Sequence, residues 1–293
     1  MIENPPIVTT QLPHAPALAS PHHLRIDPPS GWQLVDVREL WRYRELLFFL
    51  TWRDVKVRYT QAVLGIAWAV LQPLVMMIVF SVFLGRLGGL SGGDIPYPLF
   101  VLSGLIAWMF FANAVSTAGA SVVGSERLIT KIYFPRLTVP FAAVGAATFD
   151  FVISLGLLGV LMAIYGHPPS WQIVFAPFVF LILLVAALGL GTLLAALTVS
   201  YRDFRFVTPF FIQVGMYATP TIYMLIPPEP SDGLRVWMTV NPLVAPIASF
   251  RACLLGGDIP WLHLAISAIL AVGLFVVGCL YFRKVEDDFA DKI

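Results

Sequence analysis

Long apolar runs separated by short polar segments dominate the chain from about residue 62 onward. A helix needs about 20 mostly apolar residues to cross a hydrocarbon core of roughly 30 Å. Six runs reach this length, and each predicts one transmembrane helix: Gly65–Gly85, Tyr97–Gly124, Val139–Tyr165, Gln172–Tyr201, Phe206–Pro228 and Ile259–Phe282. We therefore expect an all-α integral membrane protein with six transmembrane helices in residues 62–283.

A seventh apolar run, Val236–Phe250, is too short to span and contains Pro242 and Pro246. Broken backbone at membrane depth is tolerated only where protein or a water-filled cavity covers it. The pattern therefore predicts a re-entrant or interfacial helical hairpin between the fifth and sixth transmembrane helices, at about residues 227–258.

The segment before the first transmembrane helix, residues 36–61, has a different pattern. Its apolar residues recur at spacings that place them on one face of a helix: Val37, Trp41, Phe48, Trp52, Val55 and Tyr59. Cationic residues follow one flank, which is typical of a helix lying in the membrane interface. This helix is either a generic anchor or a gate helix at the inner mouth of a pathway. The candidate gate residues are Trp41, Phe48 and Trp52.

Composition agrees with a membrane protein. Of the 293 residues, 58% are hydrophobic and 12% are charged, against about 25% charged residues in soluble domains. The mean hydropathy of +0.83 also indicates a membrane protein. These values exclude an ordinary soluble enzyme and a disordered protein. The net charge of +1 provides no basic excess for binding nucleic acid.

The Lys and Arg residues predict the orientation in the membrane. If both termini are cytoplasmic, fifteen of the 18 lie on the cytoplasmic side, and Arg86, Arg235 and Arg251 lie outside. This distribution follows the positive-inside rule. Residues 1–35 are rich in proline and lack the apolar core of a secretory signal, so we expect a mobile cytoplasmic tail there. Residues 284–293 form a second cytoplasmic tail in this prediction.

The chain lacks residues that would drive transport or catalysis alone. It contains no GxxxxGK[ST] phosphate loop, and the acidic and histidine residues of its outer segments are scattered. Its two cysteines have no metal-type spacing. We therefore expect neither enzyme activity nor a metal site. Asp150 is the one carboxylate within the predicted spans, and we expect it to be a hydrogen-bonded packing residue or a proton relay.

The cytoplasmic loop between the second and third spans predicts a short helix at about residues 125–135. Ser125 can cap it, and Pro135 stops it. The loop is either a plain connection or a docking surface for a soluble partner, and its apolar content favours docking. The candidate docking residues are Glu126, Arg127, Leu128, Lys131, Tyr133 and Phe134.

Several stretches together resemble the membrane subunit of an ABC-2 type exporter, in the branch that exports O-antigen, capsular polysaccharide and teichoic acid. They occur in this order: Trp52–Leu74, Leu128–Arg136, Tyr201–Tyr223, Asn241–Arg251 and Tyr281–Ile293. The resemblance covers most of the chain after residue 35.

The resemblance implies a homodimer in the bacterial inner membrane, bound to two cytoplasmic ABC ATPase subunits and surrounded by membrane lipids. ATP and Mg would be bound by the ATPase partners, with no cofactor on this chain. The cargo would be a lipid-linked glycan, as in lipopolysaccharide biosynthesis. Residues 125–135 would be the coupling helix, and the segment between spans five and six would form short re-entrant helices.

A glycan pathway needs flat apolar faces for sugar rings and polar groups for hydroxyls. In the fifth span, Phe210, Gln213 and Tyr217 share one helical face, and Trp68 and Gln72 do so in the first span. These five residues are the candidate channel residues. Aromatic stripes in membrane helices also serve as packing surfaces or interfacial belts.

Three other functions are compatible with the sequence. The chain could export a drug or lipid as another ABC-2 exporter, carry a small solute by ion coupling, or act as a membrane glycosyltransferase. Copurified cargo, transport without an ATPase, and activity of the isolated chain would distinguish them.

Overall fold

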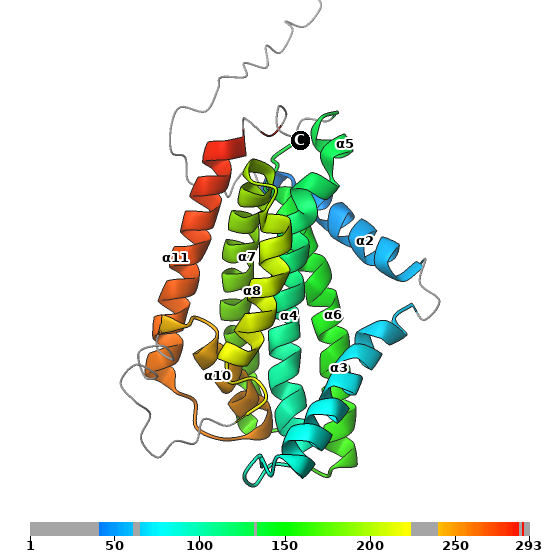
Figure 1. Cartoon of the computed structure of the whole chain (residues 1–293), viewed down its shortest axis with the longest axis vertical. Helices are drawn as coiled ribbons and strands as arrows, with labels where there is room; N and C mark the ends of the chain where they lie inside the picture. The colour runs from blue at the N-terminus through cyan, green and yellow to red at the C-terminus, as the bar shows by residue number, and fades with distance from the viewer. Residues whose placement is uncertain (1–40, 61–64, 132–133, 224–239, 287–288, 290–293) are drawn as a thin grey trace, which may run out of the picture. The chain divides into compact units, whose positions relative to one another are not determined.

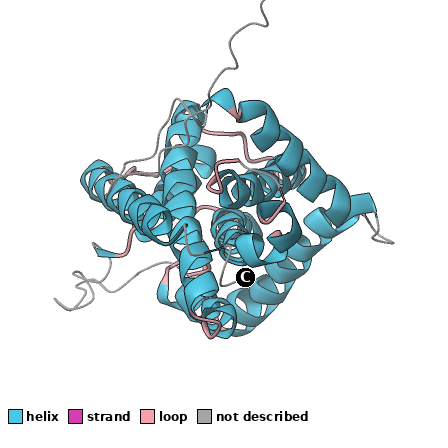
Figure 2. Ribbon diagram, turned by 90° about the horizontal axis from the view of Figure 1, so that it is seen from above, coloured by secondary structure: helices cyan, strands magenta, loops and turns pink. Residues whose placement is uncertain are grey.

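The computed structural model describes residues 41–60, 65–131, 134–223, 240–286 and 289. These residues form helices joined by short loops, without a strand in the described ranges (Figures 1 and 2). The all-α prediction is therefore confirmed. Five helical segments in these ranges are long and apolar enough to cross a membrane: Ala67–Leu87, Tyr97–Gly124, Thr138–Ile164, Trp171–Ser200 and Trp261–Val285.

The first of these five segments consists of α3 (Ala67–Phe80) and a π-helical continuation, η1 (Ser81–Leu87). The others are α4 (Tyr97–Gly124), α6 (Thr138–Ile164), η2 with α7 (Trp171–Phe175 and Ala176–Ser200), and α11 (Trp261–Val285). Helix α4 packs against both α6 and α7 and is largely buried, whereas α3 is largely exposed. The core therefore lies around α4.

Aromatic rings fill the contact between these central helices. The Phe180 ring of α7 lies 4.9 Å from the ring of Phe110 in α4 and 4.4 Å from that of Phe151 in α6, measured between centroids. Such offset and tilted ring pairs stabilise a core beyond the area they bury.

Helices α7 and α11 are joined by small residues. A Cβ atom on Gly278 of α11 would lie 2.3 Å from the carbonyl oxygen of Gly189 in α7, and one on Gly189 would lie 2.5 Å from the backbone nitrogen of Phe275. Glycine at both positions lets the two backbones touch, as small residues do in membrane helix pairs.

The predicted fifth span is represented by α8 (Phe204–Ala218), which is shorter than the sequence predicts. Its 15 residues rise about 22 Å, less than the roughly 30 Å of a hydrocarbon core. The helix ends because Pro220 lacks a backbone N–H and keeps Thr219 extended. Residues 224–228 lie outside the described ranges, so six spans remain a prediction.

Two further segments match predicted features of the chain. Helix α2 (Arg44–Thr60) lies within the predicted interface helix, whose start at Asp36 falls outside the described residues. Helix α10 (Val244–Leu255) lies within the predicted re-entrant region and ends at Gly256, whose φ of 89° favours glycine. The interfacial and re-entrant placements of these helices stay predictions.

Arg251 of α10 ties three segments together. Its Nη2 donates to the Thr221 carbonyl oxygen at 2.5 Å, and its guanidinium carbon lies over the Phe100 ring of α4. A Cβ atom on Gly104 of α4 would lie 2.1 Å from that carbonyl oxygen. The chain after α8 is thus held against α4 at a point where only glycine fits.

Candidate functional site

Helix α2 lies against α6 (Figure 1). Several of its large apolar side chains are exposed. The predicted gate residues Trp41, Phe48 and Trp52 are exposed, as expected of side chains facing lipid. Val55 was predicted on the same face, but it is buried. Helices α2 and α6 approach each other closely at Gly145 of α6, where a Cβ atom would lie 2.9 Å from the Thr51 side chain. The apolar stripe therefore divides between exposed and protein-facing residues.

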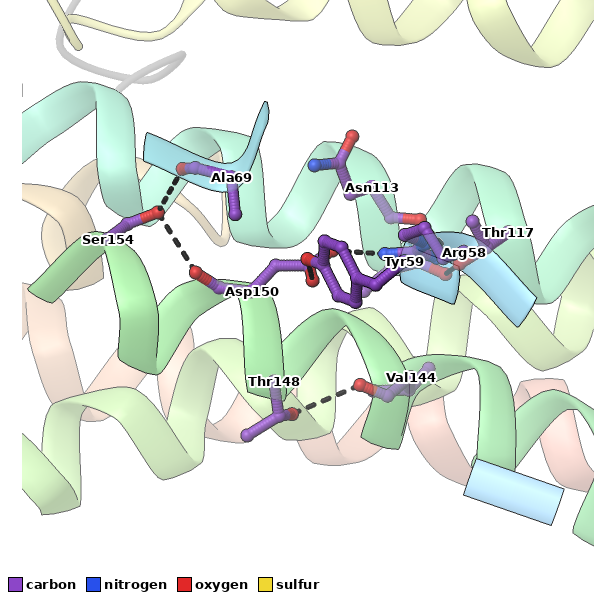
Figure 3. Close-up of polar contacts among 10 residues, drawn as sticks. Arg58, Tyr59, Ala69, Asn113, Thr117, Val144, Thr148, Asp150 and Ser154 are labelled. Carbon is purple, nitrogen blue, oxygen red and sulfur yellow. Dashed lines mark hydrogen bonds and ion pairs between the residues drawn. The ribbon is translucent and has the colours of Figure 1, made fainter. Parts of the chain in front are cut away.

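The end of α2 is bonded to Asp150, which lies about halfway along α6 (Figure 3). Arg58 donates from Nη1 to one carboxylate oxygen, and Tyr59 donates from its hydroxyl to the other. The side chains of Arg58 and Asp150 are 34% and 16% exposed. A carboxylate at membrane depth thus has both a cation and a hydroxyl donor, which offsets the cost of removing it from water.

Tyr59 retains its proton in this arrangement. Burial, followed by the hydrogen bond to Asp150, raises the pKa of the phenol far above its usual range. Its ring also packs against Phe149 of α6, with the ring centroids 6.1 Å apart. The tyrosine therefore serves as a fixed hydrogen-bond donor to Asp150.

A cavity of about 380 Å³ lies beside this cluster, between the end of α2 and helices α3, α4 and α6. Its polar lining includes Arg58, Tyr59, Gln72, Asn113, Thr117, Asp150 and Ser154. Ser154 donates to the backbone oxygen of Asp150 at 2.9 Å and to that of Ala69 in α3 at 3.4 Å. The cavity thus combines an indole ring, Trp68, with amide, hydroxyl and charged groups. This mixture suits a hydroxylated ligand.

The structure separates the five candidate channel residues into two groups. Trp68 and Gln72 line the cavity together. Phe210, Gln213 and Tyr217 lie on an exposed side of α8, where Phe210 is 63% and Tyr217 56% exposed. The α8 group is therefore not part of the packed core of this chain.

The predicted coupling loop contains a helix of four residues, α5 (Glu126–Ile129), instead of one extending to residue 135. Glu126, Arg127 and Lys131 are exposed, Leu128 is half-buried, and Tyr133 lies outside the described residues. Phe134 is predicted as a docking residue, which requires exposure, but the structure corrects this, because it is 6% exposed and packs in a cluster of buried residues: Val122, Ile129, Leu137, Val139, Ala195, Ala196, Val199, Phe282 and Phe289.

The same loop is tied to the end of α11. The backbone N–H of Arg136 donates to the Glu286 carboxylate at 3.2 Å, and its guanidinium donates to the Glu286 carbonyl oxygen. The Phe134 ring turns inward because burying an aromatic side chain against α11 is more favourable than leaving it in water. Among the described residues of the loop, the candidate docking residues that remain exposed are therefore the charged ones.

Comparison with known proteins decides the family. Residues 45–255 match the ABC-2 type transporter family. The chain belongs to this family. The chain is 32% identical to the O-antigen export system permease protein RfbA of Myxococcus xanthus over 265 residues, which are 88% of this chain and 98% of the relative.

Other relatives of this ABC-2 chain carry related names. An O-antigen export system permease protein RfbA of Klebsiella pneumoniae is 28% identical over 84% of this chain and 94% of its own length. The polysialic acid transport protein KpsM of Escherichia coli is 21% identical over 80% of this chain and 91% of its own length. The family match covers α2, the cavity, α5, α8 and α10.

Sequence reasoning identified Asp150 but missed its two partners in this ABC-2 protein. Arg58 and Tyr59 are about ninety positions away in the chain, so no local pattern joins them to it. One signal was available: a carboxylate within a span needs a cation, and Arg58 is the last cation before the first span. In the described ranges, no cluster of three potential metal-ligating residues occurs.

Proposed function

We propose that this chain is the membrane-spanning permease subunit of an ATP-driven exporter that moves a lipid-linked polysaccharide of O-antigen type. The cargo would pass from the cytoplasmic to the outer face of the bacterial inner membrane. The observation that carries the proposal is the similarity, along nearly the whole chain, to proteins named as O-antigen export permeases. The chain is a transport subunit, and ATP hydrolysis belongs to a separate ATPase.

The proposed assembly contains two copies of this chain and two ATPase subunits, which bind ATP and Mg. Both termini are cytoplasmic, and the chain after α8 completes a sixth span. Helix α2 is the gate helix, and α10 belongs to a re-entrant region. Glu126, Arg127 and Lys131 dock the ATPase, which is supported by their exposure beside a buried and therefore firm base.

The glycan path would run along the exposed faces of α3 and α8. Trp68 and Gln72 supply a ring and an amide on α3, and Phe210, Gln213 and Tyr217 do so on α8. An exposed Gln within a membrane span is unfavourable against lipid. A second copy of the chain facing these helices would enclose them around a pathway and remove that cost.

The test is copurification of the chain with its ATPase from cells that make the glycan, followed by chemical identification of the retained lipid. We expect a lipid-linked polysaccharide that is retained without nucleotide and exported into vesicles with ATP. A retained drug-like molecule or simple lipid would favour the alternative ABC-2 exporter. Transport that persists without the ATPase would instead indicate an ion-coupled carrier.

A further inference from the structure

A second cavity, of about 440 Å³, continues the first one along the groove between α4 and α6. Along α4, the first cavity reaches from Ile106 to Thr117 and the second from Thr117 to Ser125, just beyond the helix end. Along α6, the second cavity ends at Ala146 and the first begins at Ala147. The two cavities are therefore consecutive parts of one groove.

Helix α2 lines both cavities. Arg53, Asp54 and Val57 line the second cavity, Tyr59 lines the first, and Arg58 lines both. The Arg58 side chain crosses the groove to reach Asp150 on α6 (Figure 3). Thr117 of α4 is the other residue shared by the two cavities.

We propose that the Arg58–Asp150 pair seals this groove within each subunit, and that Asp150 is the positioning residue that holds Arg58 across it. Tyr59 fixes the second carboxylate oxygen, so the carboxylate cannot turn away from Arg58. Both cavities contain charged and hydroxyl groups in a largely apolar lining. A membrane protein with such groups in one groove needs a barrier, since a continuous path past them would admit water and ions. Movement of α2 away from α6 would break both bonds and join the cavities.

The test uses single cysteines in a chain whose Cys253 and Cys279 are replaced, in complex with the ATPase in lipid nanodiscs. Asn113→Cys reports on the first cavity and Ser121→Cys on the second. The probe is a charged methanethiosulfonate reagent. With the pair intact, we expect Cys at 113 to react slowly and Cys at 121 quickly.

Asp150→Asn should accelerate labelling at position 113 about tenfold and leave that at 121 unchanged, because a neutral amide no longer holds the cation. Asp150→Glu, which keeps the charge, should stay close to the parent. If Asp150→Asn does not fold, the double variant Arg58→Asp with Asp150→Arg tests the seal instead, because it restores the attraction between the two side chains with the charges exchanged. In this double variant the cysteine at position 113 should react slowly, whereas in the single variant Arg58→Gln it should react quickly.

Equal labelling at 113 and 121 in the parent would overturn the seal, and so would labelling at 113 that none of these variants changes. A uniform loss of stability with unchanged labelling would leave Asp150 a packing residue and overturn its positioning role. The measurement needs no cargo, so its outcome is independent of whether the exported molecule is a glycan.

Discussion

The guanidinium carbon of Arg251 lies 3.7 Å from the centre of the Phe100 ring. This contact joins α10, which the sequence marks as too short to span, to the N-terminal end of α4. Together with the bond from Arg251 to the Thr221 carbonyl oxygen, it fixes where the chain goes after α8. One cation thus holds α10, the N-terminal end of α4 and the segment after α8 together.

Replacing Arg251 by Met should lower the free energy of unfolding by about 2–3 kcal/mol, because a cation–π contact and a charged hydrogen bond are lost together. The stability of Arg251→Lys should lie between those of the parent and of Arg251→Met, since an ammonium group cannot both stack on Phe100 and reach Thr221. Thermal unfolding of the purified protein measures this. The matched control is Arg86→Met, which removes an exposed cation; an equal loss in the control would contradict the prediction.

Gly278→Ala should lower the free energy of unfolding by at least about 1–3 kcal/mol, because the added methyl group would overlap the Gly189 carbonyl oxygen between α11 and α7. Gly273→Ala on the same helix has no atom within 4 Å of the new Cβ and should be neutral or slightly stabilising. Comparing the yield and melting temperature of the two variants tests the contact. Similar behaviour of both would mean that the helices can separate without cost.

Phe134→Ala should cost about 3–5 kcal/mol of stability through the cavity that it leaves among buried side chains. By contrast, Lys131→Glu changes an exposed residue and should weaken ATPase association while stability is kept. Pull-down of the ATPase and thermal unfolding, measured on one preparation, separate the two effects. If Lys131→Glu and Arg127→Glu both bind the ATPase normally, the loop is a plain connection.

Tyr217→Ala should lower glycan export with little change in stability, because its side chain is 56% exposed in the subunit and leaves no internal cavity when shortened. Export per folded complex and the melting temperature are the measurements. Val214→Ala, on another exposed part of α8, is the control. Unchanged export with a lower melting temperature would assign Tyr217 to packing between subunits.

The orientation can be checked in intact cells with an impermeant thiol reagent. A cysteine at exposed Asp258, between α10 and α11, should react from outside, and one at exposed Thr130, beside α5, should react only after the membrane is opened. Cys253 and Cys279 are buried and would be replaced in the background. The reverse labelling would invert the topology predicted from the Lys and Arg distribution.

The long helices were predictable because length and apolarity are local properties. The runs at Tyr97–Gly124 and Val139–Tyr165, for example, match α4 and α6 to within one residue at each end. The position at which α8 ends was harder to predict from the sequence, although Pro220 was a signal for it. A helix end inside a continuous apolar run is hard to predict, because apolar side chains suit lipid whether the backbone is helical or extended. The backbone groups that are freed at such an end are satisfied by other parts of the protein, which the local sequence does not reveal.

The site was predictable only in its components. The spacing of Trp68 and Gln72 predicts that they share one helical face, but their meeting with Asp150 depends on how α3 lies on α6. Phe134 was misplaced because its burial requires Phe282, which is far along the chain. Contacts of this kind come from tertiary packing, and a periodic pattern describes only one helix at a time.

The contact between Gly189 and Gly278 has a practical consequence for observing transport. Two helices whose backbones touch cannot shift against each other without large overlap, so α7 and α11 form a natural reference frame. Spin labels at the exposed positions Leu181 and Val272 would keep a constant separation through the nucleotide cycle. Distances from that frame to a label at Trp52 would then report the travel of α2 alone.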